Sequence, residues 1–379
     1  MRTSADDIAA ATAAGVDAER LRALLDRPQR EVDQQILPSC QVALARDGRL
    51  VAFESYGAAS NDTRFVIFSC TKTFVASVIW MLLGEGKLAL SDRIVDHIPE
   101  FGTNGKDVVT LEQVLLHTSG FPGGLMNPTD WDDREARLAA FSRWQLEWEP
   151  GTMYRYHGLS GHWVLAELVE RVTEQDYREV LRERVLRPLG LERFALGVPR
   201  AEQGDVAPLE IRGEPATSEE MKEAWGVQMP AISTHAPLPM FGSPEYLEVG
   251  VPAANAVSTA ADVALFYQAL LRGELWHPDV LADVTRVHHT MKDELGVTCT
   301  RGLGVQINGD DGYGTWFSFG HTNSPRAFGH DGAGGMIAWA DPETGLSFCY
   351  LTNGLDDNLV RQKRRGVGLS SRAGGCVQA

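Results

Sequence analysis

The stretch Ser69-Cys70-Thr71-Lys72 offers a hydroxyl and an amine three residues apart, at the beginning of an apolar segment. The short apolar run from Phe65 to Phe68 before it predicts a strand. Beyond it, apolar residues recur at helical spacing until Gly84, namely Phe74, Val75, Val78, Ile79 and Leu82. We therefore expect a strand followed by a helix, with Ser69 at the helix N-terminus.

Residues three apart share one face of a helix, so Lys72 can reach Ser69. At a helix N-terminus, unpaired backbone N–H groups and the positive end of the helix dipole favour an anion that forms beside the serine oxygen. This arrangement suits acyl transfer. The same residues also fit a common N-cap serine followed by an exposed lysine. Further motifs must decide between the two interpretations.

Composition restricts the classes of function. The chain has 379 residues, 44% hydrophobic and 23% charged, which is typical of a globular protein with two domains or one large one with insertions. Its formal charge of −16 argues against nucleic-acid partners and mildly favours neutral substrates. The basic run from Arg361 to Arg365 is the exception, and we interpret it as the solvated face of a C-terminal helix.

The cysteines and the apolar segments bear on location. The cysteines show no paired spacing, which predicts reduced thiols and neither a disulfide framework nor a zinc site: Cys40, Cys70, Cys299, Cys349 and Cys376. Residues Met1 to Gly15 lack the pattern of an export signal. No stretch approaches the roughly 18 apolar residues of a membrane span. We expect a cytoplasmic protein without membrane contact.

Periodicity predicts strands at both ends of the chain and helices between them. After a helical, charged segment at 4–35, a turn at Asp47-Gly48 joins strands at 41–45 and 50–55. Ser258 or Thr259 caps a helix that continues to Leu271. The proline-rich segment 200–255 predicts long loops, which are often functional. The other predicted helices span 111–116, 134–141, 161–172 and 177–185, and the late strands span 303–307, 336–340 and 346–352.

Three further motifs follow Ser69 in order. They are Leu115-Leu116-His117-Thr118-Ser119-Gly120, then Pro150-Gly151-Thr152 shortly before Tyr154, Tyr156 and His157, and finally Gly329-His330-Asp331-Gly332-Ala333-Gly334-Gly335. Their order and spacing resemble the serine β-lactamase and penicillin-binding protein superfamily. More narrowly, they resemble the class C β-lactamase-like carboxylesterases called family VIII esterases. The resemblance covers residues 38–354.

The resemblance implies an α+β fold of the β-lactamase/transpeptidase type. An antiparallel sheet flanked by helices would come from the two chain ends, residues 1–100 and 291–379. A mainly helical domain, residues 101–290, would be inserted between them. The active site would lie in the groove between these two parts.

The resemblance also assigns roles to residues. Ser69 would be the nucleophile, Lys72 would assist it, and Tyr156 would take or relay the proton. The backbone N–H groups of Ser69 and Ala333 would bind the oxyanion, with Gly332 in the same strand motif. A nearby Lys72 ammonium would favour a Tyr156 phenolate, and which of the two holds the proton stays open.

Neighbouring residues are competing candidates. Tyr154 lies two positions before Tyr156 and could face the same side, but the resemblance selects Tyr156. We interpret His157 as a packing or hydrogen-bonding residue and His117 as a tie between a helix end and its loop. Cys70 points away from the face that carries Ser69 and Lys72, and buried structural thiols are the commoner case.

Two departures from the lactamase pattern indicate the substrate. Gly158 stands where an Asn amide is usual, and His330 stands in place of a lysine that would hold a substrate carboxylate. A histidine is mostly neutral at pH 7, so we expect His330 to line the pocket as a hydrogen-bond donor. The sequence therefore predicts hydrolysis of small neutral carboxylic esters without metal or organic cofactor, in the class EC 3.1.1.

Other functions share these residues. A β-lactamase or D-amino-acid peptidase is the first alternative, and an amide hydrolase or acyltransferase is a second. A catalytically silent ligand-binding member of the fold is a lesser one, because Ser69, Lys72 and Tyr156 are all present. The oligomeric state is not predicted.

Overall fold

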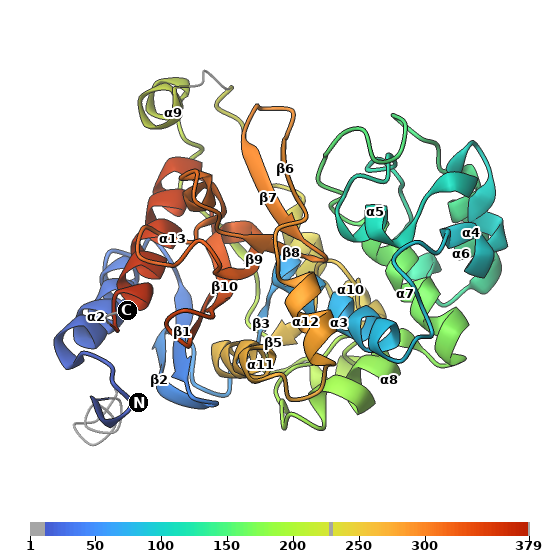
Figure 1. Ribbon diagram of the computed structural model, residues 1–379. Coiled ribbons are helices and arrows are strands. Elements are labelled where there is room, and N and C mark those ends of the chain that lie inside the picture. Colours follow the sequence, from blue (N-terminus) through green and yellow to red (C-terminus); the bar gives the residue numbers. More distant parts are fainter. Residues whose placement is uncertain (1–11, 227–229, 378–379) are drawn as a thin grey trace.

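The computed structural model describes residues 12–226 and 230–377 (Figure 1). Its main feature is an eight-stranded antiparallel sheet in the order β2-β1-β11-β10-β9-β8-β7-β6. The strands are β1 Ser39–Arg46, β2 Arg49–Gly57, β6 His289–Lys292, β7 Thr298–Gly302, β8 Val305–Ile307, β9 Phe328–Gly332, β10 Met336–Asp341 and β11 Leu346–Thr352. Strand β1 pairs directly with β11, so the two chain ends build one sheet, as predicted.

The hairpin between β1 and β2 follows from its turn residues. Asp47 and Gly48 both have positive φ, 53° and 75°, which the two central positions of a type I′ turn require. Successive β1 side chains then alternate between the two faces of the sheet. Val42 and Leu44 belong to a core cluster with α2 Ala18–Asp33 and α13 Leu359–Gly374. Ala43 and Ala45 face the larger cluster that includes α11 Ala260–Arg272 and α3 Thr71–Gly84.

Helices therefore cover both faces of the sheet, and further helices form the opposite side of the molecule (Figure 1). This is the α+β architecture that the sequence resemblance implies. The domain limits at 100/101 and 290/291 stay a prediction. The remaining α-helices are α4 Ile94–His97, α5 Leu111–Leu115, α6 Arg134–Arg143, α7 Ser160–Thr173, α8 Tyr177–Leu181, α9 Ser218–Trp225, α10 Pro244–Val249 and α12 Pro278–Val284.

Two short sheets complete the fold. Strand β3 Phe65–Val66 pairs antiparallel with β5 Val257–Ser258, just before Ser69. Strand β12 Gly354–Asp356 pairs in parallel with β4 Glu210–Arg212. The predicted strand at 65–68 is thus only two residues long. The cap of α11 is Thr259, whose hydroxyl accepts the Asp262 N–H.

The structure corrects two predictions and adds two strands that were not predicted. Segment 200–255 is not all loop, because it contains β4, α9 and α10. Strands β6 and β7, between residues 289 and 302, were not predicted. Both are short, and the residues of β6 alternate between half-buried and exposed, so the sequence carries no clear strand pattern there. The run Arg361–Arg365 is not a solvated face: Arg365 is 1% exposed and pairs with Glu31 and Asp356. Helix propensity alone does not reveal this burial.

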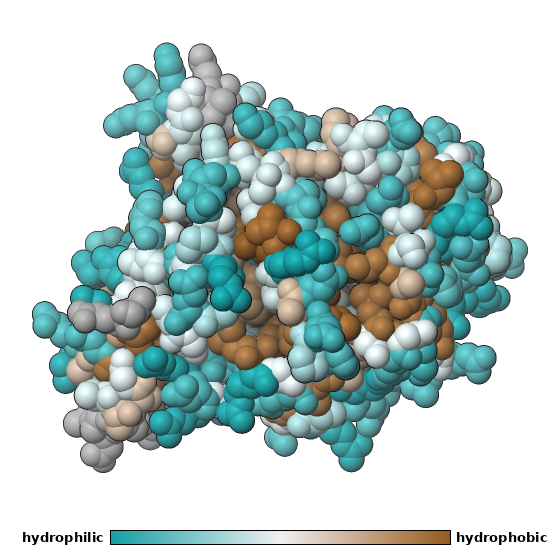
Figure 2. Space-filling model, in the orientation of Figure 1, coloured by the Kyte–Doolittle hydropathy of each residue, from teal (hydrophilic) through white to brown (hydrophobic). Residues whose placement is uncertain are grey.

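The surface drawn in Figure 2 carries both hydrophilic and apolar residues, and, as the sequence predicts, the cysteines are free thiols. On the face drawn in Figure 2, hydrophilic residues form the rim and apolar residues gather in the middle. All five cysteines are free and buried. Of the segment Met1 to Gly15, residues 1–11 lie outside the described part of the chain. Among the described helices, none combines the length and apolar character needed to cross a membrane.

Candidate active site

Ser69 lies in a 3₁₀ turn, Phe68–Cys70, that leads directly into α3. Phe68 has φ 43°, a left-handed conformation that is unusual for a bulky residue and marks backbone strain beside Ser69. The β3–β5 pair fixes the chain just before this turn. Helix α3 begins at Thr71, so Ser69 precedes it by half a turn and its side chain stays partly exposed.

Lys72 is fully buried in the first turn of α3. Its Nζ lies 3.1 Å from Ser69 Oγ and donates to the Ala253 carbonyl oxygen at 2.9 Å. Burial, aided by the positive charge of Arg301, lowers the pKa of Lys72 to about 7. A large fraction of this amine is therefore uncharged at neutral pH, the form that can accept a proton from Ser69.

Tyr156 reaches Ser69 from the loop before α7. Its hydroxyl donates to Ser69 Oγ at 2.9 Å, and Lys72 Nζ lies 5.0 Å from the centre of its ring. His117 supports this loop from the end of α5, because its Nδ1 accepts the His157 N–H at 3.2 Å and its ring lies 4.9 Å from that of Tyr156. The structure thus brings Lys72 Nζ and the Tyr156 hydroxyl within hydrogen-bonding distance of Ser69 Oγ.

The sequence argument left open whether Lys72 or Tyr156 holds the proton, and burial affects the pKa of both. Burial raises the pKa of Tyr156 well above its usual value, and the Ser69 hydrogen bond and the Arg301 charge offset this only in part. Near pH 7 the phenol is therefore neutral, and Lys72 is divided between the amine and the ammonium form. An ammonium–phenolate pair is thus disfavoured in the resting protein, because desolvation penalises both charges.

The late strand motif lies against the Ser69 turn. Gly332 ends β9, and a Cβ there would stand 2.9 Å from the Ile67 carbonyl oxygen and 3.4 Å from Cys70 Sγ. Only glycine allows this approach without a shift of the backbone. Cys70 is buried, and its Sγ donates to the His330 carbonyl oxygen at 3.2 Å. Ala333 follows directly in a 3₁₀ turn, so its backbone begins beside this contact.

His330 and Asp331 have separate environments. His330 is 1% exposed, and its Nδ1 donates to the Asp331 carbonyl oxygen at 2.7 Å. Burial and the charge of Arg301 lower the pKa of His330 to about 3, so it is neutral. Its ring lies 5.9 Å from that of Tyr156 but does not line the adjoining cavity, whereas Asp331 does. A substrate-binding role for His330 stays a prediction.

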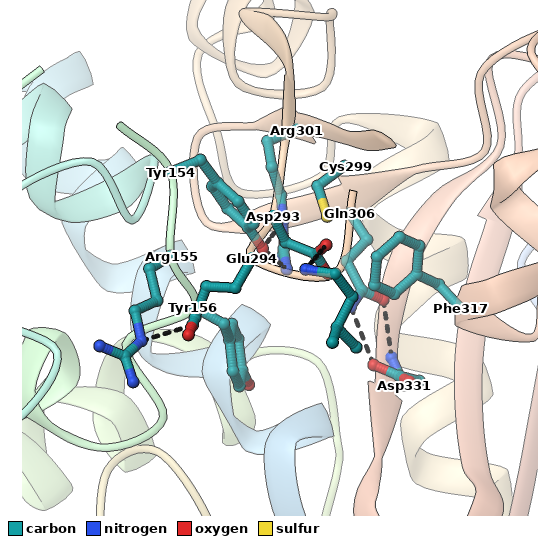
Figure 3. A pocket seen from close by; sticks show the side chains of 11 residues that line it. Tyr154, Arg155, Tyr156, Asp293, Glu294, Cys299, Arg301, Gln306, Phe317 and Asp331 are labelled. Atoms are coloured by element: carbon teal, nitrogen blue, oxygen red, sulfur yellow. Dashed lines mark hydrogen bonds and ion pairs between the residues drawn. The ribbon is translucent and has the colours of Figure 1, made fainter. Parts of the chain in front are cut away.

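A cavity of about 480 Å³ opens beside Tyr156 (Figure 3). Strands β7, β8 and β9 supply one wall, with Arg301, Gln306 and Asp331 on the same sheet face. Gln306 holds Asp331 through two hydrogen bonds, one from Nε2 to Oδ1 at 2.8 Å and one from the Asp331 N–H to Oε1 at 3.0 Å. The remaining lining residues are Tyr154, Arg155, Tyr156, Asp293, Glu294, Leu295, Cys299 and Phe317.

Sequence reasoning missed this wall. The available signal was the alternation of Cys299 and Arg301 along β7, but that strand was not predicted. Tyr154, the competing tyrosine, lines the cavity as well, yet its hydroxyl is held by Arg301 Nε at 3.1 Å and Nη2 at 2.6 Å. The position of Tyr156 at Ser69 agrees with the choice made from the sequence.

The remaining polar candidates serve the loops. His157 Nδ1 donates to the Arg155 carbonyl oxygen at 2.7 Å, and its Nε2 lies 3.1 Å from both Ser119 Oγ and the Phe121 N–H. Burial lowers the pKa of His157 to about 4, so it is neutral. Within residues 12–226 and 230–377, no cluster of three or more His, Cys, Asp or Glu side chains has the geometry to hold a metal ion.

Comparison with known proteins identifies the family. The family model described as Beta-lactamase matches residues 21–371. This chain belongs to the beta-lactamase family. It is 30% identical over 331 residues to Esterase/beta-lactamase LipL of Mycobacterium tuberculosis, a match that covers 81% of this chain and 73% of LipL.

Two solved structures share its fold. The crystal structure of a penicillin-binding protein homologue from Caulobacter crescentus superposes with a TM-score of 0.79 at 28% identity and covers 96% of this chain and 99% of the homologue. A family VIII carboxylesterase superposes with a TM-score of 0.76 at 25% identity and covers 95% and 99% of the two chains. The resemblance inferred from the sequence motifs is confirmed.

Proposed function

We propose that this member of the beta-lactamase family is a serine hydrolase that cleaves small neutral carboxylic esters through an acyl-enzyme on Ser69. One observation carries the proposal: Ser69 Oγ lies 3.1 Å from Lys72 Nζ and 2.9 Å from the hydroxyl of Tyr156, and Tyr156 lines the cavity. A nucleophile within hydrogen-bonding distance of a neutral amine can lose its proton as it attacks.

The proposed steps follow from these contacts. Ser69 Oγ attacks the ester carbonyl carbon while its proton passes to Lys72 Nζ. The backbone N–H groups of Ser69 and Ala333 bind the resulting oxyanion. As the C–O bond to the alcohol breaks, Tyr156 gives its proton to the departing oxygen and regains one from Lys72. Water then attacks the acyl group by the reverse sequence, releasing the acid and restoring Ser69.

The charges around the cavity support a neutral substrate. His330, in the position of the family's lysine, is neutral. The cavity lining combines the three carboxylates of Asp293, Glu294 and Asp331 with two guanidinium groups, an excess of one negative charge that suits a neutral substrate better than an anionic one. The relatives include a protein named Esterase/beta-lactamase and a carboxylesterase. A cytoplasmic location belongs to the same proposal, supported by five free thiols.

A direct assay tests the proposal. We expect the wild-type protein to hydrolyse short-chain p-nitrophenyl esters and Ser69→Ala to lose that activity. Nitrocefin, measured in parallel, distinguishes the second candidate, a β-lactamase or D-amino-acid peptidase, which the penicillin-binding protein homologue among the structural relatives favours. Nitrocefin turnover exceeding ester turnover would replace the ester proposal. Turnover of neither substrate would support a silent ligand-binding protein.

A further inference from the structure

Arg301 is a buried cation that the proposed mechanism does not use. Arg301 lies on β7 and is 2% exposed, and its Nε and Nη2 both donate to the Tyr154 hydroxyl oxygen. Its Nη1 is buried without a hydrogen-bond partner among the described residues, and none of the ion pairs found among them includes Arg301. A buried guanidinium without a carboxylate partner is costly, so its position calls for a role.

The guanidinium lies close to the proton-transfer group. Its Cζ is 5.4 Å from the centre of the Tyr156 ring, and Lys72 Nζ is 5.0 Å from the same centre. The two nitrogen-bearing groups are therefore at most about 10 Å apart, in a poorly solvated part of the molecule. At that separation, a fixed positive charge disfavours a second one on Lys72.

Most other groups that face Lys72 carry no charge near pH 7. Burial lowers the pKa values of His117, His162 and His330 and raises those of Cys70 and Tyr156, so all five are neutral. Two neighbours stay charged. Arg301 is protonated at any accessible pH, and Asp331 is ionised because Lys363 and other positive groups lower the pKa of its carboxyl.

We propose that Arg301 is a positioning residue that holds Lys72 in its neutral amine form by charge repulsion across the Tyr156 ring, with Asp331 as the opposing charge. This inference rests on the proposed function for its catalytic meaning, but the charge coupling itself is a property of the folded protein. The buried guanidinium of Arg301 thus provides a permanent positive charge near the proton-transfer group. His330, which is neutral, does not provide one.

A titration that needs no turnover tests the coupling. The chain has six lysines, so protein labelled with ¹³C at lysine Cε gives few NMR signals, and Lys72→Met assigns the one from Lys72. In the wild type we expect this signal to titrate near pH 7. In Arg301→Gln we expect its pKa to rise by about one unit or more. In Asp331→Asn we expect its pKa to fall.

Tyr154→Phe is the matched control. It removes the hydrogen-bond partner of Arg301 and keeps the charge, so the Lys72 pKa should stay at the wild-type value. A Tyr154→Phe shift equal to that of Arg301→Gln would assign Arg301 a purely structural role and overturn the proposal. An unshifted Lys72 in Arg301→Gln would overturn it too.

Two further comparisons keep the test decisive. If Arg301→Gln does not fold, as judged by circular dichroism, the downward shift in Asp331→Asn carries the test, and its absence contradicts the coupling. The acidic limb of kcat/KM for a neutral ester should move in the same directions as the NMR pKa. If the NMR shifts occur without any Ser69-dependent turnover, the coupling stands and the hydrolase proposal fails.

Discussion

Lys72 Nζ donates to the Ala253 carbonyl oxygen at 2.9 Å. Ala253 lies in the loop that follows α10, so this bond ties the amine to that loop while it lies 3.1 Å from Ser69 Oγ. Ala253 belongs to the proline-rich segment 200–255, so that segment contributes to the site through its backbone. Because one N–H of the amine donates to this carbonyl oxygen, the nitrogen lone pair or another N–H can face Ser69 Oγ.

The pKa of Lys72 predicts the pH dependence of ester hydrolysis. Because burial lowers it to about 7, the amine is neutral above that pH and protonated below it. We expect kcat/KM to fall about tenfold per pH unit below 7 and to level off above it. A pH profile with a neutral ester, followed by pH-stat, measures this. An acidic limb near pH 10, the ordinary lysine value, would contradict the assignment.

Tyr156→Phe should lower acylation by about 10²- to 10⁴-fold, the usual contribution of a positioned proton donor. The phenol hydroxyl contacts Ser69, and removing it leaves the ring packing intact. Single-turnover kinetics and a melting curve measure both effects. Tyr154→Phe is the matched variant and should cost less than tenfold. A near-normal Tyr156→Phe rate would assign the whole proton transfer to Lys72.

Gly332→Ala should impair both stability and turnover. Its Cβ would meet the Ile67 carbonyl oxygen at 2.9 Å, so β9 must move away from the Ser69 turn. We expect a loss of about 1–3 kcal/mol in the free energy of unfolding and a fall in kcat of about 10²-fold or more as the oxyanion donors separate. Gly204→Ala, where the added Cβ meets no atom within 4 Å, is the control. Equal behaviour of the two variants would refute this packing argument.

Gly158→Asn tests why the site should favour esters. A Cβ at Gly158 meets no atom within 4 Å, so the family's amide side chain has room to enter. We expect nitrocefin hydrolysis to rise while ester hydrolysis stays within about tenfold of the wild type. Gly158→Ala adds a side chain without the amide and should show no such rise. The same response from both variants would show that the missing amide does not set the preference.

Local sequence signals predicted the parts of the fold that local chemistry controls. The Asp47-Gly48 turn, the helix from Thr71 to Gly84 and the Thr259 cap all depend on residues close in sequence. The motifs around Ser69, Tyr156 and Gly332 indicated the family, and the structure brings these residues together. These elements needed no knowledge of distant contacts.

The features that were missed depend on tertiary contacts. Arg365 is a basic residue in helix α13, but it is buried because it pairs with two carboxylates from other elements. Glu31 lies in α2, far away in the sequence, and Asp356 lies in β12. Arg301 and Asp331 meet at the cavity only after β7, β8 and β9 pair. The lowered pKa of Lys72 and the raised pKa of Tyr156 likewise follow from burial, which their spacing in the sequence does not specify.

Covalent trapping tests the central claim most directly. A fluorophosphonate should form one adduct, which tandem mass spectrometry of the digested protein would locate on Ser69. Cys70→Ala should keep the adduct, because that thiol is buried and its pKa is raised by burial, and Ser69→Ala should abolish it. An adduct that persists in Ser69→Ala, or a folded wild-type protein that hydrolyses esters yet forms no adduct at Ser69, would contradict the acyl-enzyme account.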